Sequence, residues 1–508
     1  MPIANPDPNA PLPSPQTLFI NANVVGWPPG VYAVLVQGGR VAIVSRGLVV
    51  PEPDMQVVDV RGAWIAPSLA DWHTHFTSAA VHTRRLSLAA YPSAAVALKA
   101  VNVALRAPQY DECGAFVATG MGPGAWADAA ILNRSTLDAM CPTKPVALYF
   151  TDGRCVANTR MLVLGGYGHD THPHGYCSRA DAAALAARVL EIADPYVVDE
   201  WVGALAARVA ALGITEIVDF ERGDNEGDWQ RRCGPKQFCT LRVRASIWPE
   251  HLDEAIAKRH TAGAGIAGTR GLVTVGPFHV VADGTLAHMT AYCKQAYANT
   301  ASRGRLNYAP DDIGALCAKA TGAGLAVAVH AAGDEALRIV VDQLDASEPL
   351  RESTIEHPAL VDALEVPRAA ALGLAASVSP TRMVHDVPLA HALWRGREGR
   401  TWPYRSLQSA RLPLRFGSGG PEVPIQPWVA MACAMSRGGY QPQECLTAAE
   451  AFAASTWNGR VHVSEGERAD LILIDADPLG AGAEEMRRVG VLGTMLGGNW
   501  THRAKELA

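Results

Sequence analysis

Eight short, apolar, strand-like runs follow one another along the chain, and helical stretches rich in Ala, Leu and Arg separate most of them. This alternation is typical of a parallel α/β sheet, because parallel neighbours need a crossover connection. Eight is also the number of strands that a closed barrel of this type requires. The runs span residues 64–71, 214–220, 241–248, 272–283, 325–330, 353–357, 374–380 and 414–418. We therefore predict an α/β fold built on a (β/α)8, TIM-like barrel.

The two chain ends and one long gap lie outside this pattern. The gap after the first strand is far longer than the other connections, so residues 77–200 are predicted to form an inserted subdomain. Both ends carry β-rich runs with Gly-Gly turns, and neither end alone can bury a face. We expect residues 17–65 and 458–508 to form one composite β-sandwich beside a barrel of residues 66–457. Residues 1–16, rich in Pro and Asn, are predicted to be an extended arm.

The composition argues against several classes of partner. The chain has 508 residues, of which 49% are hydrophobic and 19% charged, as in globular proteins. A formal net charge of -6 gives no electrostatic basis for binding nucleic acid. No apolar run is long enough to span a bilayer, and the first residues lack the features of a signal peptide. Ten cysteines stand without a CxxC pair, which favours a reducing, cytoplasmic location. We expect neither nucleic acid nor membrane as a partner.

Histidines gather where the predicted strands end. In a barrel these ends converge on one mouth, so the side chains are expected to meet. Alternate residues of a strand share a face, so a His-x-His pair can present both imidazoles to one ion. The histidines concerned are His73, His75, His279, His330 and His357. Zinc takes about four such ligands and, in catalytic sites, leaves one position for water. The pattern predicts one divalent metal per chain, with zinc the first choice.

A His-x-His pair is a weak signal by itself. With 16 histidines in the chain, a pair of this kind arises by chance roughly once in two such sequences. A second pair, His172 and His174, lies in the polar segment "THPHG" and is predicted to be surface. The first pair differs because His330 and His357 follow two further strands, which favours the metal-site hypothesis.

Two acidic residues near these histidines have structural explanations as well. Asp334 follows a glycine and precedes a helical run in "HAAGDEAL", which favours a helix N-cap. Contact with a substrate is the alternative for Asp334. Glu356 points away from the face of its neighbour His357, so burial against a basic partner is expected rather than catalysis.

Several segments stand in a characteristic order and spacing along almost the whole chain, from about residue 17 to 505. Among them are "GAWIAPSLADWHTHF", "VAVHAAGDEAL", "STIEHPALV", "RFGSGGPEV" and "ADLILIDADP". With these segments the chain resembles the amidohydrolase superfamily, in its amidohydrolase-3 or YtcJ-like branch. The resemblance implies a (β/α)8 barrel, a β-sandwich built from both chain ends, and an insertion after the first barrel strand. It also implies hydrolysis of an amide or related C–N bond by metal-activated water.

The chain departs from that branch at two positions next to the metal. His279 stands where the branch usually has a lysine that bridges two metals when carboxylated, which imidazole cannot do. A mononuclear centre is therefore expected. Gly419 stands where an aspartate usually binds metal and shuttles the proton. Glu422 and Asp283 are the nearest candidates for the missing general base.

Two further departures concern the substrate. Arg154 stands where a histidine is usual, and its guanidinium could clamp a substrate carboxylate. His288 stands where an arginine is usual and is expected to face the substrate. The expected partner is a small molecule, and association with a second copy in a homodimer is left open.

Two functions from different classes follow from these residues. One is a mononuclear zinc hydrolase acting on an amide, a formamide or a related C–N bond. The other is a barrel with altered, non-hydrolytic chemistry, such as decarboxylation or rearrangement, or one that binds a small molecule without turnover. Metal content together with hydrolysis of N-acyl and N-formyl compounds distinguishes them.

Overall fold

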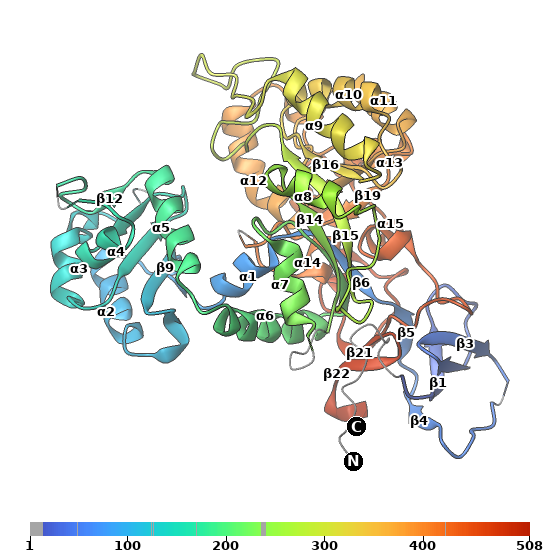
Figure 1. Cartoon of the computed structure of the whole chain (residues 1–508). Helices are drawn as coiled ribbons and strands as arrows, with labels where there is room; N and C mark the ends of the chain where they lie inside the picture. The colour runs from blue at the N-terminus through green and yellow to red at the C-terminus, as the bar shows by residue number, and fades with distance from the viewer. Residues whose placement is uncertain are drawn as a thin grey trace. The chain divides into compact units, whose positions relative to one another are not determined.

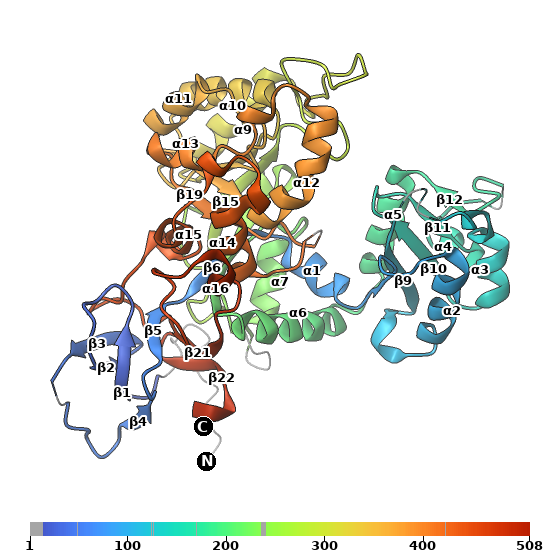
Figure 2. The ribbon, with the colours of Figure 1, turned by 180° about the vertical axis from the view of Figure 1, so that it is seen from behind.

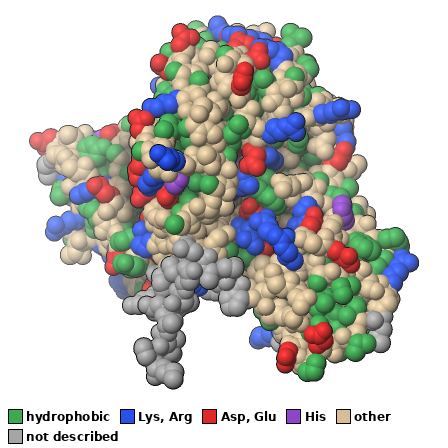
Figure 3. All heavy atoms as spheres, turned by 45° about the vertical axis from the view of Figure 1, so that its right-hand side comes forward, with side chains coloured by type: hydrophobic (Ala, Val, Ile, Leu, Met, Phe, Trp, Pro, Cys, Tyr) green, Lys and Arg blue, Asp and Glu red, His purple; other side chains and the backbone are tan. Residues whose placement is uncertain are grey.

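The computed structural model describes residues 14–507, except residues 48, 123, 125, 169, 235–239 and 422. The chain divides into two compact units (Figures 1 and 2). The first unit contains both chain ends, up to Phe76 and from Leu205 onward, and the second is Thr77–Ala204. Among the described helices, none is both long and apolar enough to cross a membrane. On the face of the molecule in Figure 3, acidic and basic side chains are interspersed.

The first unit contains an eight-stranded parallel barrel, as the sequence predicts. Its strands in spatial order are β19 (Leu414–Phe416), β18 (Ala375–Val378), β17 (Thr354–Glu356), β16 (Val327–His330), β15 (Val273–Val281), β14 (Arg242–Ile247), β13 (Ile214–Asp219) and β6 (Leu69–Thr74). The two end strands are joined just beyond β19, where the backbone N–H of Gly419 donates to the carbonyl of His73 at 2.8 Å. Every described neighbour pair in this sheet is parallel, which requires the crossover helices.

Helices follow the barrel strands along the chain (Figure 1). They are α7 (Asn225–Arg232), α8 (Leu252–Ala257), α9 (Pro310–Gly322), α10 (Asp334–Ser347), α11 (Glu365–Ala371), α12 (Pro380–Leu393), α13 (Tyr404–Ser409), α14 (Pro427–Ser436) and α15 (Ala448–Ala454). In α10 the buried side chains include Leu337, Val340, Val341 and Leu344, at the spacing of an amphipathic helix.

The predicted first strand, residues 64–71, is wrong as a single barrel strand. The chain forms two strands there, β5 (Trp64–Pro67) and β6, on either side of Ser68. Strand β5 pairs antiparallel with β20 (Leu471–Ile474), outside the barrel, and only β6 enters the barrel sheet. A continuous apolar run therefore serves two sheets in succession, which its hydrophobicity alone does not reveal.

Strands from both chain ends share a second sheet. Its order is β22 (Asn499–Arg503), β21 (Val491–Leu496), β20, β5, β1 (Thr17–Val24), β2 (Tyr32–Gln37) and β3 (Arg40–Ser45), with β4 (Gln56–Asp59) paired to β1. One core cluster contains Phe19 and Val34 from the start of the chain and Leu473 and Met495 from its end. The helix α16 (Ala483–Met486) lies between β20 and β21 in sequence. Division of this sheet into the two layers of a sandwich stays a prediction, and residues 1–13 of the predicted arm lie outside the described residues.

The second unit has its own six-stranded sheet and its own core. The sheet order is β12 (Tyr176–Cys177), β11 (Cys155–Ala157), β10 (Val146–Phe150), β9 (Ala115–Met121) and β7 (Leu86–Ser87), with β8 (Asp111–Glu112) paired to β9. Its helices are α2 (Ala94–Ala104), α3 (Arg134–Met140), α4 (Thr159–Leu164) and α5 (Arg179–Glu191). Two helices cross the unit boundaries along the chain, α1 (Phe76–His82) and α6 (Pro195–Ala210).

Candidate metal centre

The histidines expected to meet at the barrel mouth line one cavity. The cavity has a volume of about 310 Å³, and its lining includes His73, His75, His279, His330 and His357. His73 lies in β6, and His75 follows that strand directly. His279, His330 and His357 come from, or directly follow, β15, β16 and β17. The convergence of the carboxyl ends of parallel strands thus gathers imidazoles that are far apart in the sequence.

Several ring spacings are close to that of two imidazoles on a single ion, and the pair His73 and His357 is closer, at 4.3 Å. The ring centroid of His73 lies 5.5 Å from that of His75 and 5.9 Å from that of His279. The centroids of His330 and His357 are 5.6 Å apart. Two imidazoles bound to one tetrahedral zinc place their ring centres about 5 Å apart, given Zn–N distances of about 2.0–2.1 Å. The donor set, neutral imidazoles at a cavity with room for water, therefore fits zinc or a similar divalent metal.

Three of these imidazoles are fixed in orientation by a hydrogen bond at Nδ1. The Nδ1 of His73 lies 2.7 Å from Oε2 of Glu356, and that of His330 lies 3.1 Å from Oδ1 of Asp283. The Nδ1 of His279 lies 2.9 Å from the carbonyl oxygen of Ala328. A carboxylate or carbonyl oxygen can only accept, so each Nδ1 carries the hydrogen and each Nε2 keeps its lone pair for a metal.

Burial keeps the rings of His73, His279 and His357 neutral. It lowers the pKa of His73 well below its usual value, and the nearby His75 and His330 lower it further. Burial also lowers the pKa of His279 and of His357 well below the usual value, with His73 adding to the effect in both. Neutral imidazole is the form that binds a metal ion, so the site needs no proton release from these three rings on binding.

Glu356 has a role that sequence reasoning missed. It was expected to be buried against a basic partner, and it is buried, but its carboxylate accepts from His73. Its other oxygen accepts from the hydroxyl of Thr354. The ligand atoms of His73, Glu356 and His357 all lie within 4.8 Å of one another. Two atoms that ligate one tetrahedral ion lie about 3.4 Å apart. The 2.7 Å separation of His73 Nδ1 and Glu356 Oε2 is shorter and indicates a hydrogen bond between the two side chains rather than a shared ion.

Asp283 is placed as a support for His330 rather than as a base. Its side chain is fully buried and accepts four hydrogen bonds. The donors are the Nδ1–H of His330 and the backbone N–H groups of Tyr292, Ala332 and Gly333. These bonds occupy both oxygens, and Asp283 does not line the cavity. The hypothesis that Asp283 acts directly as a general base is therefore not favoured.

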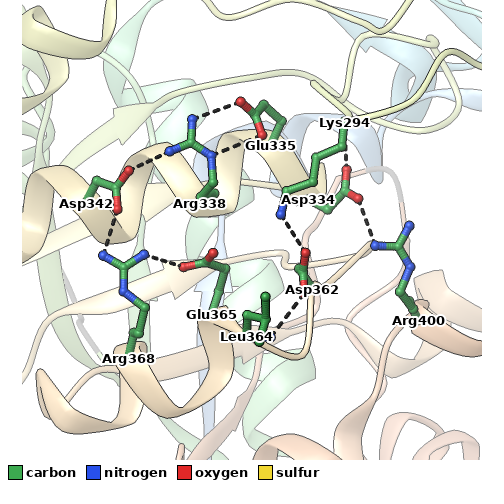
Figure 4. Close-up of polar contacts among 10 residues, drawn as sticks. All are labelled: Lys294, Asp334, Glu335, Arg338, Asp342, Asp362, Leu364, Glu365, Arg368 and Arg400. Carbon is green, nitrogen blue, oxygen red and sulfur yellow. Dashed lines mark hydrogen bonds and ion pairs between the residues drawn. The ribbon is translucent and has the colours of Figure 1, made fainter.

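Asp334 does not line the cavity, and its polar contacts are drawn in Figure 4. It is the first residue of α10 and is fully buried, whereas Gly333 occupies the N-cap position. One oxygen accepts from the backbone N–H of Lys294 at 2.8 Å and the other from Arg400 at 3.0 Å. Neither the predicted N-cap role nor the alternative contact with substrate matches this position.

Three further residues, His288, Arg154 and Glu422, were predicted to belong to the site. His288 lies in the loop after β15, where its Nδ1 is 3.2 Å from the hydroxyl of Thr285. Thr285 itself lines the cavity. Arg154 belongs to the second unit, where its guanidinium forms an ion pair with Asp152 at 2.8 Å, and its substrate role stays a prediction. Glu422, the other candidate base, lies outside the described residues.

Gly419 lines the cavity beside one of the histidines. A Cβ atom added there would lie 3.8 Å from Cε1 of His357 and 3.2 Å from Oγ of Ser379. Its φ of 66° is a left-handed conformation that glycine adopts freely. Residue 419 therefore supplies no carboxylate to the cavity, and a Cβ added there would be in close contact with Ser379.

Known proteins resemble this chain over most of its length. A family model described as "Amidohydrolase family" matches residues 56–502. The N-substituted formamide deformylase of Arthrobacter pascens is 24% identical over 529 aligned positions, which cover 92% of this chain and 94% of that protein. A putative amidohydrolase, YtcJ of Bacillus subtilis (strain 168), is 22% identical, with 88% and 90% of the two chains covered.

Solved structures share the fold. An uncharacterized metal-dependent hydrolase from Pyrococcus horikoshii OT3 superposes with a TM-score of 0.78 at 20% identity, covering 92% of this chain and 99% of that chain. An adenosine deaminase from Xanthomonas campestris with bound zinc superposes with a TM-score of 0.54 at 13% identity, covering 98% and 95%. At these identities the likeness concerns the fold alone.

Proposed function

Because the chain belongs to the amidohydrolase family, we propose that it is a hydrolase of a C–N bond in a small amide or formamide, with one divalent metal. One observation carries the proposal most strongly. His73, His279 and His330 are each fixed through Nδ1 by a buried acceptor, and each lines the same cavity. Such anchoring is typical of metal ligands, since the second bond fixes the ring and its tautomer. The formamide part of the proposal is supported by the similarity to a formamide deformylase.

The chain offers more imidazoles than one ion needs. We assign His73, His75 and His330 as ligands, with His279 or His357 completing the set. Zinc held there would supply Lewis acidity and would lower the pKa of a bound water. Glu356 and Asp283 would keep His73 and His330 in the metal-binding tautomer. Trp248, Leu286 and Trp402 in the cavity lining suit an apolar substituent on the substrate.

A second function is favoured by two observations. Gly419 supplies no carboxylate, and the oxygens of Asp283 are already occupied. If neither Gly419 nor Asp283 is replaced as a source of the general base, a non-hydrolytic reaction or binding without turnover is favoured. For either function we propose a reducing compartment, which the nine described cysteines support because all of them are free thiols.

Metal analysis and a substrate panel test the proposal. The purified chain should carry about one zinc, and the zinc-loaded chain should hydrolyse at least one member of a panel of N-formyl and N-acetyl derivatives of primary amines. His73→Ala should lose metal and activity together, whereas His172→Ala, in the second unit, should lose neither. A metal-loaded protein that binds but does not hydrolyse these compounds would favour the second function.

A further inference from the structure

Ser379 has the position of a helix cap but lacks the bond of one. It follows β18 directly and is the N-cap residue of α12, whose first residue is Pro380. A serine at this position usually accepts a hydrogen bond from a backbone N–H of the first turn. The side chain of Ser379 makes no such bond. It is 9% exposed, and its Oγ has no hydrogen-bond partner among the described residues. A buried hydroxyl without a partner is unfavourable for folding, and a ligand that accepts its hydrogen would remove this cost.

The hydroxyl lies on the histidine cavity rather than in the core. Ser379 lines that cavity together with Gly419 and His357. The Cβ position built on Gly419 is 3.2 Å from Oγ of Ser379 and 3.8 Å from Cε1 of His357. The serine hydroxyl, the glycine and the imidazole thus border one niche. Because residue 419 has no side chain, the niche is open to a group from a ligand.

We propose that Ser379 is a substrate-binding residue whose hydroxyl donates a hydrogen bond to the carbonyl oxygen of an amide or formamide group in this niche. This inference rests on the proposed function and names the group that this function would recognise. A hydroxyl is a neutral donor and suits the neutral oxygen of an amide. Val378 and Met383, which line the cavity beside Ser379, reduce competition from water, and a hydrogen bond is stronger in such surroundings.

A matched pair of serines provides the test. Ser377 lies two residues earlier, is 1% exposed, and its Oγ also has no partner among the described residues. Ser377, however, lines a different, smaller cavity of about 20 Å³. Both serines are changed to alanine in the full, zinc-loaded chain. Affinity for an N-formyl amine is measured by calorimetry, and hydrolysis is measured by release of the amine. We expect Ser379→Ala to weaken binding or lower kcat/KM about fivefold or more, as for one lost hydrogen bond, and Ser377→Ala to leave both unchanged.

Stability separates binding from a structural role. The hydroxyl of Ser379 makes no capping bond, so Ser379→Ala should not lower the melting temperature. Ser178 does cap α5 in a reciprocal capping box, and Ser178→Ala should lower it. Equal losses of affinity in Ser379→Ala and Ser377→Ala, or no loss in either, would overturn the role of Ser379 while leaving the proposed hydrolase intact. If the wild-type chain neither binds nor hydrolyses any formamide or acetamide, both proposals fall.

Discussion

The imidazole Nδ1 of His73 and the carboxylate Oε2 of Glu356 lie 2.7 Å apart, and both side chains are almost completely buried. The bond joins two strands of the barrel, β6 and β17, that are not neighbours in the sheet. It therefore depends on closure of the barrel and fixes the ring of His73 in the tautomer that presents Nε2 to the cavity. Metal affinity should depend on this bond as well as on the ligands themselves.

Changing Glu356 tests that dependence. Glu356→Gln keeps an acceptor oxygen but removes the charge, and we expect zinc affinity to fall about 10-fold. Glu356→Leu removes the acceptor as well, so the loss should approach about 100-fold. Competition with a chelator of known affinity measures both values. Glu352→Gln is the control, because Glu352 pairs with Arg244 and its side chain is half exposed. Equal affinity in the wild type and both Glu356 variants would contradict a role in orienting His73.

The pair His73 and Glu356 also shows where sequence reasoning stops. Apart from the first, the barrel strands could be predicted from alternation, because strand length and crossover spacing are local properties of the sequence. The gathering of the histidines around one cavity could be predicted because parallel strands place their carboxyl ends together. Neither rule predicts which side chain forms a hydrogen bond with which histidine. Glu356 stands next to His357 in sequence, but its hydrogen bond goes to His73 across the barrel.

The roles predicted for two aspartates differ from their observed contacts, because those contacts also depend on the three-dimensional fold. Asp283 and Asp334 stand near strand ends, as catalytic carboxylates do, yet backbone N–H groups and an arginine occupy their oxygens. Which backbone N–H groups donate to these carboxylates depends on the conformation of the loops around them, and the sequence pattern does not give it. Ser379 lies in a segment predicted as a strand, and nothing in "ASVSPT" marks its hydroxyl as unpaired. Only the fold shows that it lies beside Gly419.

The two His-x-His pairs of the chain should respond differently to the same substitution. We expect His73→Ala with His75→Ala to abolish metal binding, because both rings line the proposed site. Elemental analysis of purified protein measures the change. His172→Ala with His174→Ala is the matched control in the second unit and should retain about one zinc per chain. Both double variants should keep the circular dichroism spectrum of the wild type, since the barrel has a large apolar core. Loss of metal in the control instead would show that the assignment of the site is wrong.

Gly419→Asp should tighten metal binding. A carboxylate at this position would extend from a point 3.8 Å from Cε1 of His357 and would add a negative ligand to a set of neutral imidazoles. If a general base is what the site lacks, hydrolysis of a formamide should rise about 100-fold or more as well. Metal titration by calorimetry and an amine-release assay measure the two effects separately.

The control for this variant is another left-handed glycine. Gly438 has a φ of 61°, close to the 66° of Gly419, and only Val384 lies within 4 Å of its added Cβ. Gly438→Asp carries similar backbone strain but should leave metal affinity unchanged. Unchanged affinity in both variants would indicate that residue 419 does not face the ion. Higher affinity without activity would favour the non-hydrolytic function.

The last prediction concerns Asp219, at the end of β13. Its carboxyl group is fully buried, and burial raises its pKa from 3.8 to about 6, with Glu221 adding to the increase. The backbone N–H of Phe76 and the indole N–H of Trp229 donate to it and offset part of this effect. A raised pKa means that the folded state holds the proton more tightly than the unfolded state between these two values. The contribution of Asp219 is therefore most favourable below about pH 4 and is lost as the pH rises through about 6.

Asp219→Asn should remove this pH dependence. Two pKa units correspond to about 3 kcal/mol, so the free energy of unfolding of the variant, relative to wild type, should rise by about that amount between pH 4 and pH 7. The absolute difference also includes the change in the bond from Trp229, so the test is the trend with pH rather than the value at one pH. Urea unfolding of both proteins at a series of pH values measures the difference. Asp59→Asn is the control of opposite sign, because hydrogen bonds from Arg61 and Asn21 lower the pKa of exposed Asp59. This variant should lose stability in full above the unfolded pKa, and the loss should disappear as the pH falls through the folded pKa. A relative stability of Asp219→Asn that stays constant from pH 4 to pH 7 would show that Asp219 does not titrate in this interval.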